Sequence, residues 1–387
     1  MITGFASSLY KKYEGSTFEL LTDTTLSALE MAGLEKNDID GMFITSLPGT
    51  FDGYATSHFF TNQVSQYLGI KPKFTDMIDY GGASALTMIY KAYKAIRAGE
   101  AESVLCIVGG KASYLRSKGV PVDSVDKAYN NMVSITPFDK LFRGLEELNP
   151  VSDYALVANR HKHLFKSTDE QRALIAVRQR FNAMQNDKAM FREPLTVDQV
   201  LNSTMVSYPL RLLEIVYPID GFHVFVVSKK KKSKSAIREL DILGYGEAHW
   251  PSMPSELDDI VYTPAVESAK GLLNEKIDAF ELYDSFTITV LLQAEDIGLA
   301  EKGKGGEFFE KHDTTYKGDV PINTGGGTLN LGQPAYMSGG VILEEALLQL
   351  NDIADGHQVK GANTVLVNGI GGWNRSHSVT LVLGEKK

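Results

Sequence analysis

Residues 79–99, DYGGASALTMIYKAYKAIRAG, join a glycine turn directly to a helical pattern, and this stretch decides the fold class. Apolar residues recur at three- and four-residue spacing from Leu86 to Ile96, which predicts an amphipathic helix, and Gly99 supplies a C-terminal stop. An apolar run, AESVLCIVGG at 101–110, follows and predicts a buried strand. A turn, a helix and a strand in this order are typical of a βαβ crossover on a parallel sheet.

A second unit of the same kind occurs near the C-terminus. Residues 323–350 contain a glycine turn and a helical pattern, and ANTVLVNGIGG at 362–372 follows as the strand. Upstream of each unit a helical pattern is followed by Ile-Asp and an apolar strand. These segments are the helical patterns at 18–31 and 265–273, followed by EKNDIDGMFI at 35–44 and NEKIDAFEL at 274–282, each of which ends in the apolar strand. A repeat of this length predicts a duplicated α/β architecture.

The repeat also sets the domain organisation that we predict. The N-terminal half spans 1–230 and the C-terminal half spans 231–387. An inserted loop region at about 111–207 interrupts the first half, polar and irregular at first and then helical. We expect this region to fold over one edge of the molecule.

The bulk composition describes an ordinary soluble globular protein. The chain has 387 residues, of which 43% are hydrophobic and 22% charged, and a formal net charge of −9. A negative total disfavours nucleic acid as a partner, because phosphate binding needs a basic face. The single cysteine excludes a disulfide framework and a cysteine-based metal site, and no apolar run is long enough to suggest a membrane span. We therefore expect a cytoplasmic protein with no metal site of its own and no membrane partner.

Several stretches occur in the order in which the thiolase superfamily has them, and the chain resembles its sterol-carrier-protein-type, lipid-transfer branch. They are GGASALT (81–87), YALVANRHKH (154–163), the segment 194–221, ELYDSFTITVLLQAEDIGL (281–299), INTGGGTLNLGQPAYMSGG (322–340) and VNGIGG (367–372). The resemblance implies a five-layered αβαβα arrangement and an acyl-CoA substrate, with coenzyme A as part of the substrate and no covalently bound cofactor. It further implies a homodimer paired through the strand VLCIV at 104–108, and a small partner protein with a zinc ribbon and an OB fold.

The resemblance also implies where the family's catalytic groups would stand, and this chain departs from the family at each place. Gly82 takes the position of the nucleophilic cysteine, and Gln333 takes that of the histidine in the family's Gly-His-Pro motif. Asn368 or Gly369 stands where the family has a second acid–base residue. Tyr283 opens YDSF in place of a histidine. An acyl-enzyme on a cysteine is therefore not expected.

The glycines that remain suggest a different chemistry. The turns at Gly81–Gly82 and Gly325–Gly327, with Gly371 in the last strand, can aim backbone N–H groups at a carbonyl oxygen and form an oxyanion hole. Ser84 stands beside the first turn and is expected to line the same site. Such a hole would stabilise the enolate of a CoA thioester. A retro-aldol reaction forms this enolate with one base and one acid and needs no acyl-enzyme.

The chain is similar to the steroid side-chain retro-aldolases, a cysteine-less branch, at Tyr283 and Tyr336, and this likeness suggests base and acid roles for the two. A tyrosine that titrates near pH 10 is a poor base, so it would need neighbouring donors, of which Gln333 could be one. We expect Asp284 to orient its turn rather than react. His161 lies on a helix with several basic residues and could meet CoA phosphates, although a solvated face is the simpler interpretation.

We therefore predict a CoA-thioester lyase that cleaves or forms a carbon–carbon bond without a cysteine nucleophile. Two alternatives stay open. The chain could be a catalytically silent acyl-CoA-binding or scaffold subunit, or it could be a conventional acetyl-CoA acyltransferase. The last requires Cys106, within the apolar run VLCIV, to reach the site, although that run predicts a buried strand residue. Arg375 and His377 could also line the pocket, but no pattern in the sequence fixes their direction.

Overall fold

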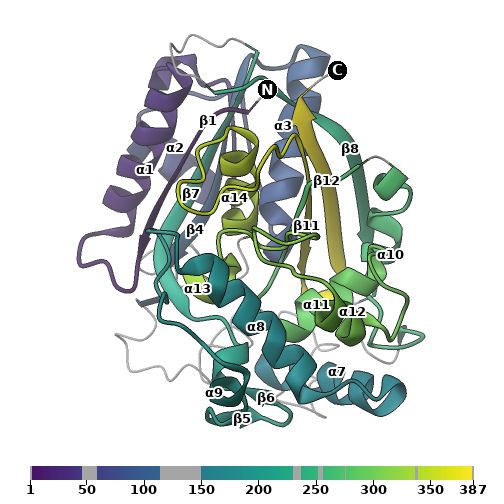
Figure 1. Cartoon of the computed structure of the whole chain (residues 1–387). Coiled ribbons are helices and arrows are strands. Elements are labelled where there is room, and N and C mark those ends of the chain that lie inside the picture. Colours follow the sequence, from purple (N-terminus) through teal and green to yellow (C-terminus); the bar gives the residue numbers. More distant parts are fainter. Residues whose placement is uncertain are drawn as a thin grey trace.

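Two β-sheets stand side by side, with one layer of helices between them and one on each outer side (Figure 1). The fold is taken from a computed structural model. It describes residues 2–45, 59–113, 150–229, 237–251, 256–274, 276–335 and 339–385. No helix of the described ranges is long and apolar enough to cross a membrane.

The first sheet has the strand order β1-β7-β4-β2-β3. Its strands are β1 (Ile2–Tyr10), β2 (Gly41–Ile44), β3 (Phe74–Met77), β4 (Ser103–Lys111) and β7 (Pro218–Ser228). β2 is parallel to β3 and β4, whereas β7 is antiparallel to β1 and β4. The two-residue strand β10 (Gln333–Pro334) adds in parallel to the start of β7. The crossover helices are α2 (Phe60–Leu68) and α3 (Ser84–Ala98).

The second sheet repeats this order as β8-β12-β11-β9. Its strands are β8 (Leu240–His249), β9 (Ala279–Leu282), β11 (Thr364–Gly371) and β12 (His377–Glu385). Ile322 forms a single parallel bridge with Phe280 of β9, at the position that β3 takes in the first sheet. β11 is parallel to β9 and antiparallel to β12, as β4 is parallel to β2 and antiparallel to β7. This correspondence confirms the predicted duplication.

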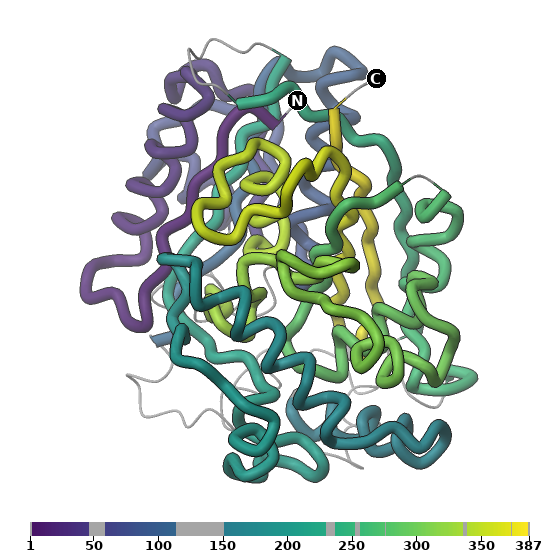
Figure 2. Tube along the Cα trace, viewed as in Figure 1, coloured from purple at the N-terminus to yellow at the C-terminus, as the bar shows by residue number. Residues whose placement is uncertain are grey.

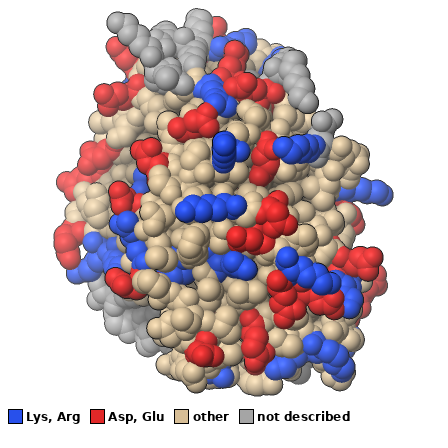
Figure 3. Space-filling view, in the orientation of Figure 1, with Lys and Arg blue, Asp and Glu red and all other residues tan. Residues whose placement is uncertain are grey.

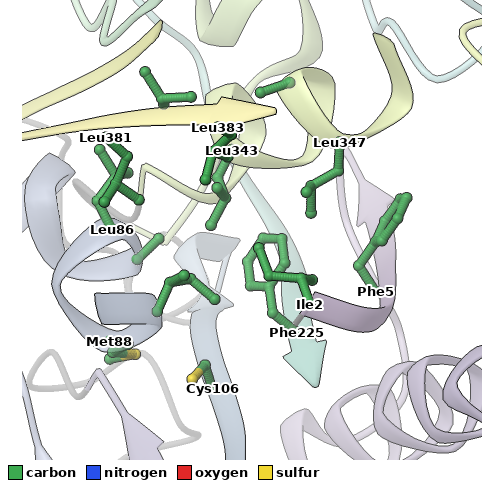
Figure 4. Packing of buried hydrophobic residues seen from close by; sticks show 14 of the residues in the cluster. Ile2, Phe5, Leu86, Met88, Cys106, Phe225, Leu343, Leu347, Leu381 and Leu383 are labelled. Carbon is green, nitrogen blue, oxygen red and sulfur yellow. The ribbon is translucent and has the colours of Figure 1, made fainter. Parts of the chain in front are cut away.

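Three buried hydrophobic clusters define the five layers. α1 (Thr17–Ala32) and α2 cover the outer face of the first sheet. α3 and α14 (Gly340–Leu350) lie between the two sheets, where Leu86, Leu343 and Leu381 pack together (Figure 4). The outer face of the second sheet is covered by α10 (Ala265–Ser268), α11 (Thr287–Asp296) and α12 (Gly305–Lys311). The αβαβα arrangement that the resemblance implies is confirmed.

The described part of the inserted region is helical and lies across one end of both sheets, as the teal segment of Figure 2 shows. It contains α7 (Pro150–Phe165), α8 (Asp169–Ala183), α9 (Val197–Leu201) and the hairpin β5 (Met205–Ser207) with β6 (Leu210–Arg211). Thr168 begins α8 with a capping box, so the helical pattern forms two helices rather than one. α8 contacts α11, α12 and α13 (Gly327–Leu331), which brings the insertion to the ends of β9 and β10.

Two expectations from the sequence are wrong. The run VLCIV lies within β4, which pairs with β2 on one side and β7 on the other, so it offers no free edge to a second copy of the chain. The homodimer itself stays a prediction. The pattern at 265–273 is not one helix, because α10 ends at Ser268 and Gly271 takes a φ of 77°. The predicted boundary at residue 230 borders residues 230–236, which lie outside the described ranges.

Charges of both signs are interspersed on the face of the molecule that Figure 3 shows. Lysine and arginine side chains alternate with acidic ones there and form no continuous basic stripe on that face. The mixed charges on this face accord with a chain whose formal net charge is −9.

Candidate active site

The first glycine turn lies at the amino end of α3. Residues Gly81–Ala83 form a short 3-10 turn, and Gly81 has a φ of 57°, a conformation that favours glycine. The hydroxyl of Ser84 accepts a hydrogen bond from the N–H of Tyr80 at 2.8 Å, and Asp79 accepts one from Gly81 at 3.3 Å. The side chain of Ser84 therefore stabilises the turn by accepting a hydrogen bond from its backbone.

This turn packs backbone against backbone on the end of β11. A Cβ atom at Gly371 would lie 2.2 Å from the carbonyl oxygen of Tyr80 and 2.5 Å from the nitrogen of Gly82. A Cβ atom at Gly369 would lie 2.6 Å from the carbonyl oxygen of Gly82. No side chain fits at these distances, so both strand residues must be glycine. The structure thus brings Gly82 and Gly371 together, two of the residues expected to line the site.

Tyr283 fills the space beside Gly82. A Cβ atom at Gly82 would lie 2.7 Å from Cδ2 and Cε2 of the Tyr283 ring and 2.3 Å from the carbonyl oxygen of Ile370. A side chain at position 82 therefore requires both the tyrosine ring and the backbone at Ile370 to move. Gly82 and Tyr283, which the resemblance places at two of the family's catalytic positions, are thus in direct contact.

The hydroxyl of Tyr283 is buried and bonded. The residue follows β9, its side chain is fully buried, and its O–H donates to Oε1 of Gln333 at 2.9 Å. Burial raises the pKa of Tyr283 well above its ordinary value, and the nearby Tyr154 and Asp284 raise it further. The phenol is therefore neutral at neutral pH, so it is suited to donate a proton and poorly suited to accept one.

The other expected site residues fall in different places. Gln333 lies in β10, buried against β7, and joins Tyr283. The side chain of Asn368 is directed to the outer face of the second sheet, where its Nδ2 donates to Ser378 at 3.1 Å and Thr380 at 2.8 Å. Only the backbone carbonyl of Asn368 meets Tyr283, by accepting its N–H at 3.0 Å. Tyr336 lies outside the described residues, so its role stays a prediction.

The second glycine turn, Gly325–Gly327, is closed by Asp284. This carboxylate accepts the N–H groups of Thr328 at 2.8 Å and Leu329 at 3.0 Å, at the start of α13. A Cβ atom at Gly327 would lie 2.2 Å from Asp284 Oδ2. Burial raises the pKa of Asp284 to about 6, and these hydrogen bonds oppose the shift. The N–H groups that begin α13 are thus taken by Asp284 and are not available to a substrate oxygen.

The sequence did not indicate that Tyr154, Ser285 and Arg375 form a group close to Tyr283. Tyr154 of α7 stacks on Phe286, with 4.1 Å between ring centroids, and the guanidinium of Arg375 lies 5.0 Å from the Tyr154 centroid. The buried hydroxyl of Ser285 lies close to both Tyr154 and Tyr283, and hydrogen bonding with it opposes the rise in the pKa of each phenol. A tyrosine in an amphipathic helix is normally part of the core, so only the contact with Arg375 distinguishes Tyr154.

A buried contact between a histidine and a carboxylate behind the site was also missed. Nδ1 of His223, in β7, lies 2.6 Å from Oε2 of Glu344, in α14. The His223 ring packs against the start of α14, where a Cβ atom at Gly340 would lie 2.6 Å from Cγ. The preceding Gly339 approaches the carbonyl oxygen of Gly82, at 2.0 Å from an added Cβ. The pair therefore supports the helix terminus that contacts the first turn.

Two further predictions can be judged. Cys106 is buried in β4, as the sequence predicts, and burial raises the pKa of its thiol. The preferred interpretation of His161 as part of a solvated face is wrong. Its ring is fully buried, with Nε2 3.0 Å from Glu295 and Nδ1 2.8 Å from Ser167, so it is not placed to meet a phosphate.

Comparison with known families and proteins agrees with this geometry. A family model described as "Thiolase C-terminal domain-like" matches residues 246–385. An acetyl-CoA acetyltransferase of Methanothermobacter thermautotrophicus is 28% identical over 92% of this chain and 91% of its own length. A steroid side-chain-cleaving aldolase of Thermomonospora curvata is 28% identical over 87% of this chain and 86% of its own length.

Two further similarities concern sterol carrier proteins and an aldolase that is named for two components. Sterol carrier protein 2 of Bos taurus is 24% identical over 74% of this chain and 54% of its own length. Among solved structures, a chain of an "Ltp2-ChsH2(DUF35) aldolase" superposes with a TM-score of 0.79 and 27% identity, over 99% of this chain and 97% of that chain.

Proposed function

Because the chain belongs to the sterol-carrier-protein-like branch of the thiolase superfamily, we propose that it cleaves or forms a carbon–carbon bond in a CoA thioester by a retro-aldol type of reaction. The observation that carries this proposal is the contact between Gly82 and Tyr283. The tyrosine ring occupies the place of a nucleophilic side chain and leaves a proton donor there instead. The similarity to a steroid side-chain-cleaving aldolase supports the same class of reaction.

In the cleavage direction the substrate is a β-hydroxyacyl-CoA. A base removes the hydroxyl proton, the bond between Cα and Cβ breaks, and a carbonyl product leaves while the electron pair forms the enolate of the shortened thioester. The enolate oxygen is negatively charged. The amino end of α3 can supply the N–H group of Gly82 and the positive end of the helix dipole for this charge, whereas the N–H group of Gly81 already donates to Asp79.

Tyr283 completes the reaction as the acid. It transfers its phenolic proton to the α-carbon of the enolate, which yields the shorter acyl-CoA. An enolate carbon is far more basic than a phenolate, so the raised pKa of Tyr283 does not prevent this transfer. Gln333 holds the hydroxyl in position. The resemblance to the retro-aldolases suggests base and acid roles for Tyr283 and Tyr336. Because the raised pKa of Tyr283 makes it the acid in this proposal, the base is left to Tyr336.

A partner protein is part of the proposal. The aldolase structure that resembles this chain is named for two components, one of which carries DUF35. This name supports the expectation of a small partner, to which any zinc would belong. Among the described residues no group of three or more histidine, cysteine or acidic side chains could hold a metal ion.

The test is product analysis without free CoA. A panel of β-hydroxyacyl-CoAs is incubated with the chain, alone and with the partner, and acetyl-CoA, propionyl-CoA and the carbonyl product are measured by mass spectrometry. Release of the shorter thioester without added CoA is expected. Release only when free CoA is added would instead indicate acyl transfer, which the similarity to an acetyl-CoA acetyltransferase favours as the second candidate. Binding without any turnover would indicate a silent subunit.

A further inference from the structure

Arg375 is held in an unusual way next to this site. Its side chain is only 1% exposed, and Nη1 donates to Asp153 at 3.1 Å. The guanidinium lies over the Tyr154 ring. Asn374 and Arg375 have φ values of 51° and 59°, a conformation that residues other than glycine rarely adopt. Backbone strain of this kind persists where the surrounding structure enforces it, and it is often found at functional sites.

Two nitrogen atoms of Arg375, Nε and Nη2, lie along one edge of the guanidinium group. Nε and Nη2 are both buried and have no hydrogen-bond partner among the described residues. On this edge two N–H bonds run parallel at the spacing of the two oxygens of a carboxylate, the geometry of bidentate Arg–carboxylate pairs. A buried cation with unpaired N–H groups is destabilising, so packing alone does not explain why this edge is left open.

Another arginine in the same chain shows what a structural role looks like. Arg172 is equally buried, but its Nε donates to Glu214 at 3.0 Å and its Nη2 donates to Asp169 at 2.9 Å. The edge that is free in Arg375 is therefore occupied in Arg172. Among the described residues, the contrast leaves the Nε and Nη2 edge of Arg375 open to a further acceptor.

The open edge belongs to the surroundings of Tyr283. Tyr154, beneath the guanidinium, lies close enough to Tyr283 for the two phenols to interact electrostatically. The hydroxyl of Ser285 is buried and lies near both phenols. Gly371, four residues before Arg375, touches the first glycine turn. The Nε and Nη2 edge of the guanidinium and the Ser285 hydroxyl are thus polar groups around the proposed reaction centre.

We propose that Arg375 binds a carboxylate on the acyl group of the substrate, with Ser285 as a second donor, so that the chain acts on CoA half-thioesters of dicarboxylic acids. This inference rests on the proposed function for the place of the thioester beside Gly82. Asp153 already pairs with Arg375, but its side chain is 22% exposed, so water shares its charge and leaves the cation able to attract a second anion. The phosphates of CoA are separated from the thioester by the pantetheine arm, which makes them the weaker candidates.

The test uses binding of esters that cannot undergo cleavage. Calorimetry compares pairs of equal chain length, succinyl-CoA with butyryl-CoA, glutaryl-CoA with valeryl-CoA and adipyl-CoA with hexanoyl-CoA, on the full chain with its partner. At one length the dicarboxylic ester is expected to bind at least about tenfold more tightly, because a buried bidentate pair is charge-assisted. Arg375→Gln is expected to remove this preference and leave the monocarboxylic ester unchanged. Arg160→Gln, at an exposed arginine of α7, is the control and keeps the preference.

Equal affinities within every pair in the wild-type chain would overturn the inference, and this comparison needs no variant to fold. A preference that survives Arg375→Gln would overturn it as well. If Arg375→Gln instead weakens both members of a pair and free CoA equally, the edge binds a CoA phosphate and the carboxylate assignment is wrong. Because these esters carry no β-hydroxyl, the result does not depend on turnover, so failure of the lyase proposal and failure of this inference are distinguishable.

Discussion

Removing one oxygen from Tyr283 separates the proposed chemistry from the packing. Tyr283→Phe keeps the ring against Gly82 and deletes only the O–H that donates to Gln333. Oε1 of Gln333 then stays buried without that donor, which costs about 1–3 kcal/mol in the free energy of unfolding. Loss of a positioned acid is expected to lower turnover by roughly 10²–10⁴-fold. Binding of a CoA ester should not change, since the ring and the glycine turn are retained.

The double variant Tyr283→Phe with Gln333→Leu makes the test sharper. With both partners apolar and of similar shape, the buried hydrogen bond is removed without leaving an unpaired atom, a change that is nearly neutral for stability. We therefore expect the double variant to recover most of the unfolding free energy and none of the turnover. Urea unfolding gives the stability, single-turnover mass spectrometry gives the rate, and calorimetry gives the affinity. Tyr316→Phe, at a buried tyrosine elsewhere in the central core, serves as the control.

Two results would refute this reasoning. The first is a Tyr283→Phe variant that turns over at the wild-type rate. The second is a double variant whose rate returns together with its stability, because the hydroxyl would then act only by holding the structure.

Three further predictions follow from the same contacts. Gly82→Cys is expected to lower the free energy of unfolding by about 1–3 kcal/mol in urea titrations, because its Cβ would overlap Ile370 and the Tyr283 ring; an unchanged midpoint would mean that the two can move apart. Cys106 should resist iodoacetamide in the folded chain and react after unfolding, since it is buried and its thiol pKa is raised; rapid labelling of the folded chain would revive acyl transfer as the function. The folded-state pKa of Asp284, about 6, lies above its unfolded value, so its contribution is fully present below about pH 4 and is lost as the pH rises through 6. The stability of wild type relative to Asp284→Asn should therefore fall by about 2 kcal/mol between pH 4 and pH 7, and a constant difference across urea titrations in that range would contradict the raised pKa.

The sequence predicted the fold well where the signal is local. The period of the helix from Ser84 to Ala98 and its stop at Gly99 are both as predicted. The strand neighbours were harder to predict, because pairing depends on residues far along the chain. The run VLCIV was expected to pair with a second copy of the chain, yet a continuous apolar run is typical of a strand that is covered on both faces, and β4 is such a strand.

The sequence predicted which residues belong to the candidate site, but it did not predict how their side chains are arranged in space. The exchanges at Gly82 and Tyr283 were both visible in the sequence, whereas their shared volume depends on a contact across about two hundred positions of the chain. The direction of Arg375 depends on two consecutive residues with positive φ, neither of which is a glycine that would have signalled the bend. Asn368 shows the reverse case, because its position in the motif suggested a role that the alternation of β11 directs away from the turn.

The shared volume at Gly82 also bears on how the proposed chemistry relates to thiol chemistry. A cysteine at 82 facing Tyr283 would be crowded. The residue that joins Tyr283 is Gln333, which the resemblance places where the family has its histidine, so the cysteine would have an amide rather than an imidazole there. A smaller residue at 283 facing Gly82 would lose the acid and leave a cavity. Each single exchange therefore gives a chain suited to neither reaction. Changes at 82, 283 and 333 would have to be accompanied by a shift of the backbone at Ile370, whose carbonyl oxygen also occupies the space of a Cβ atom at position 82. We conclude that the absence of a thiol at this turn is one half of a matched pair whose other half is the buried phenol.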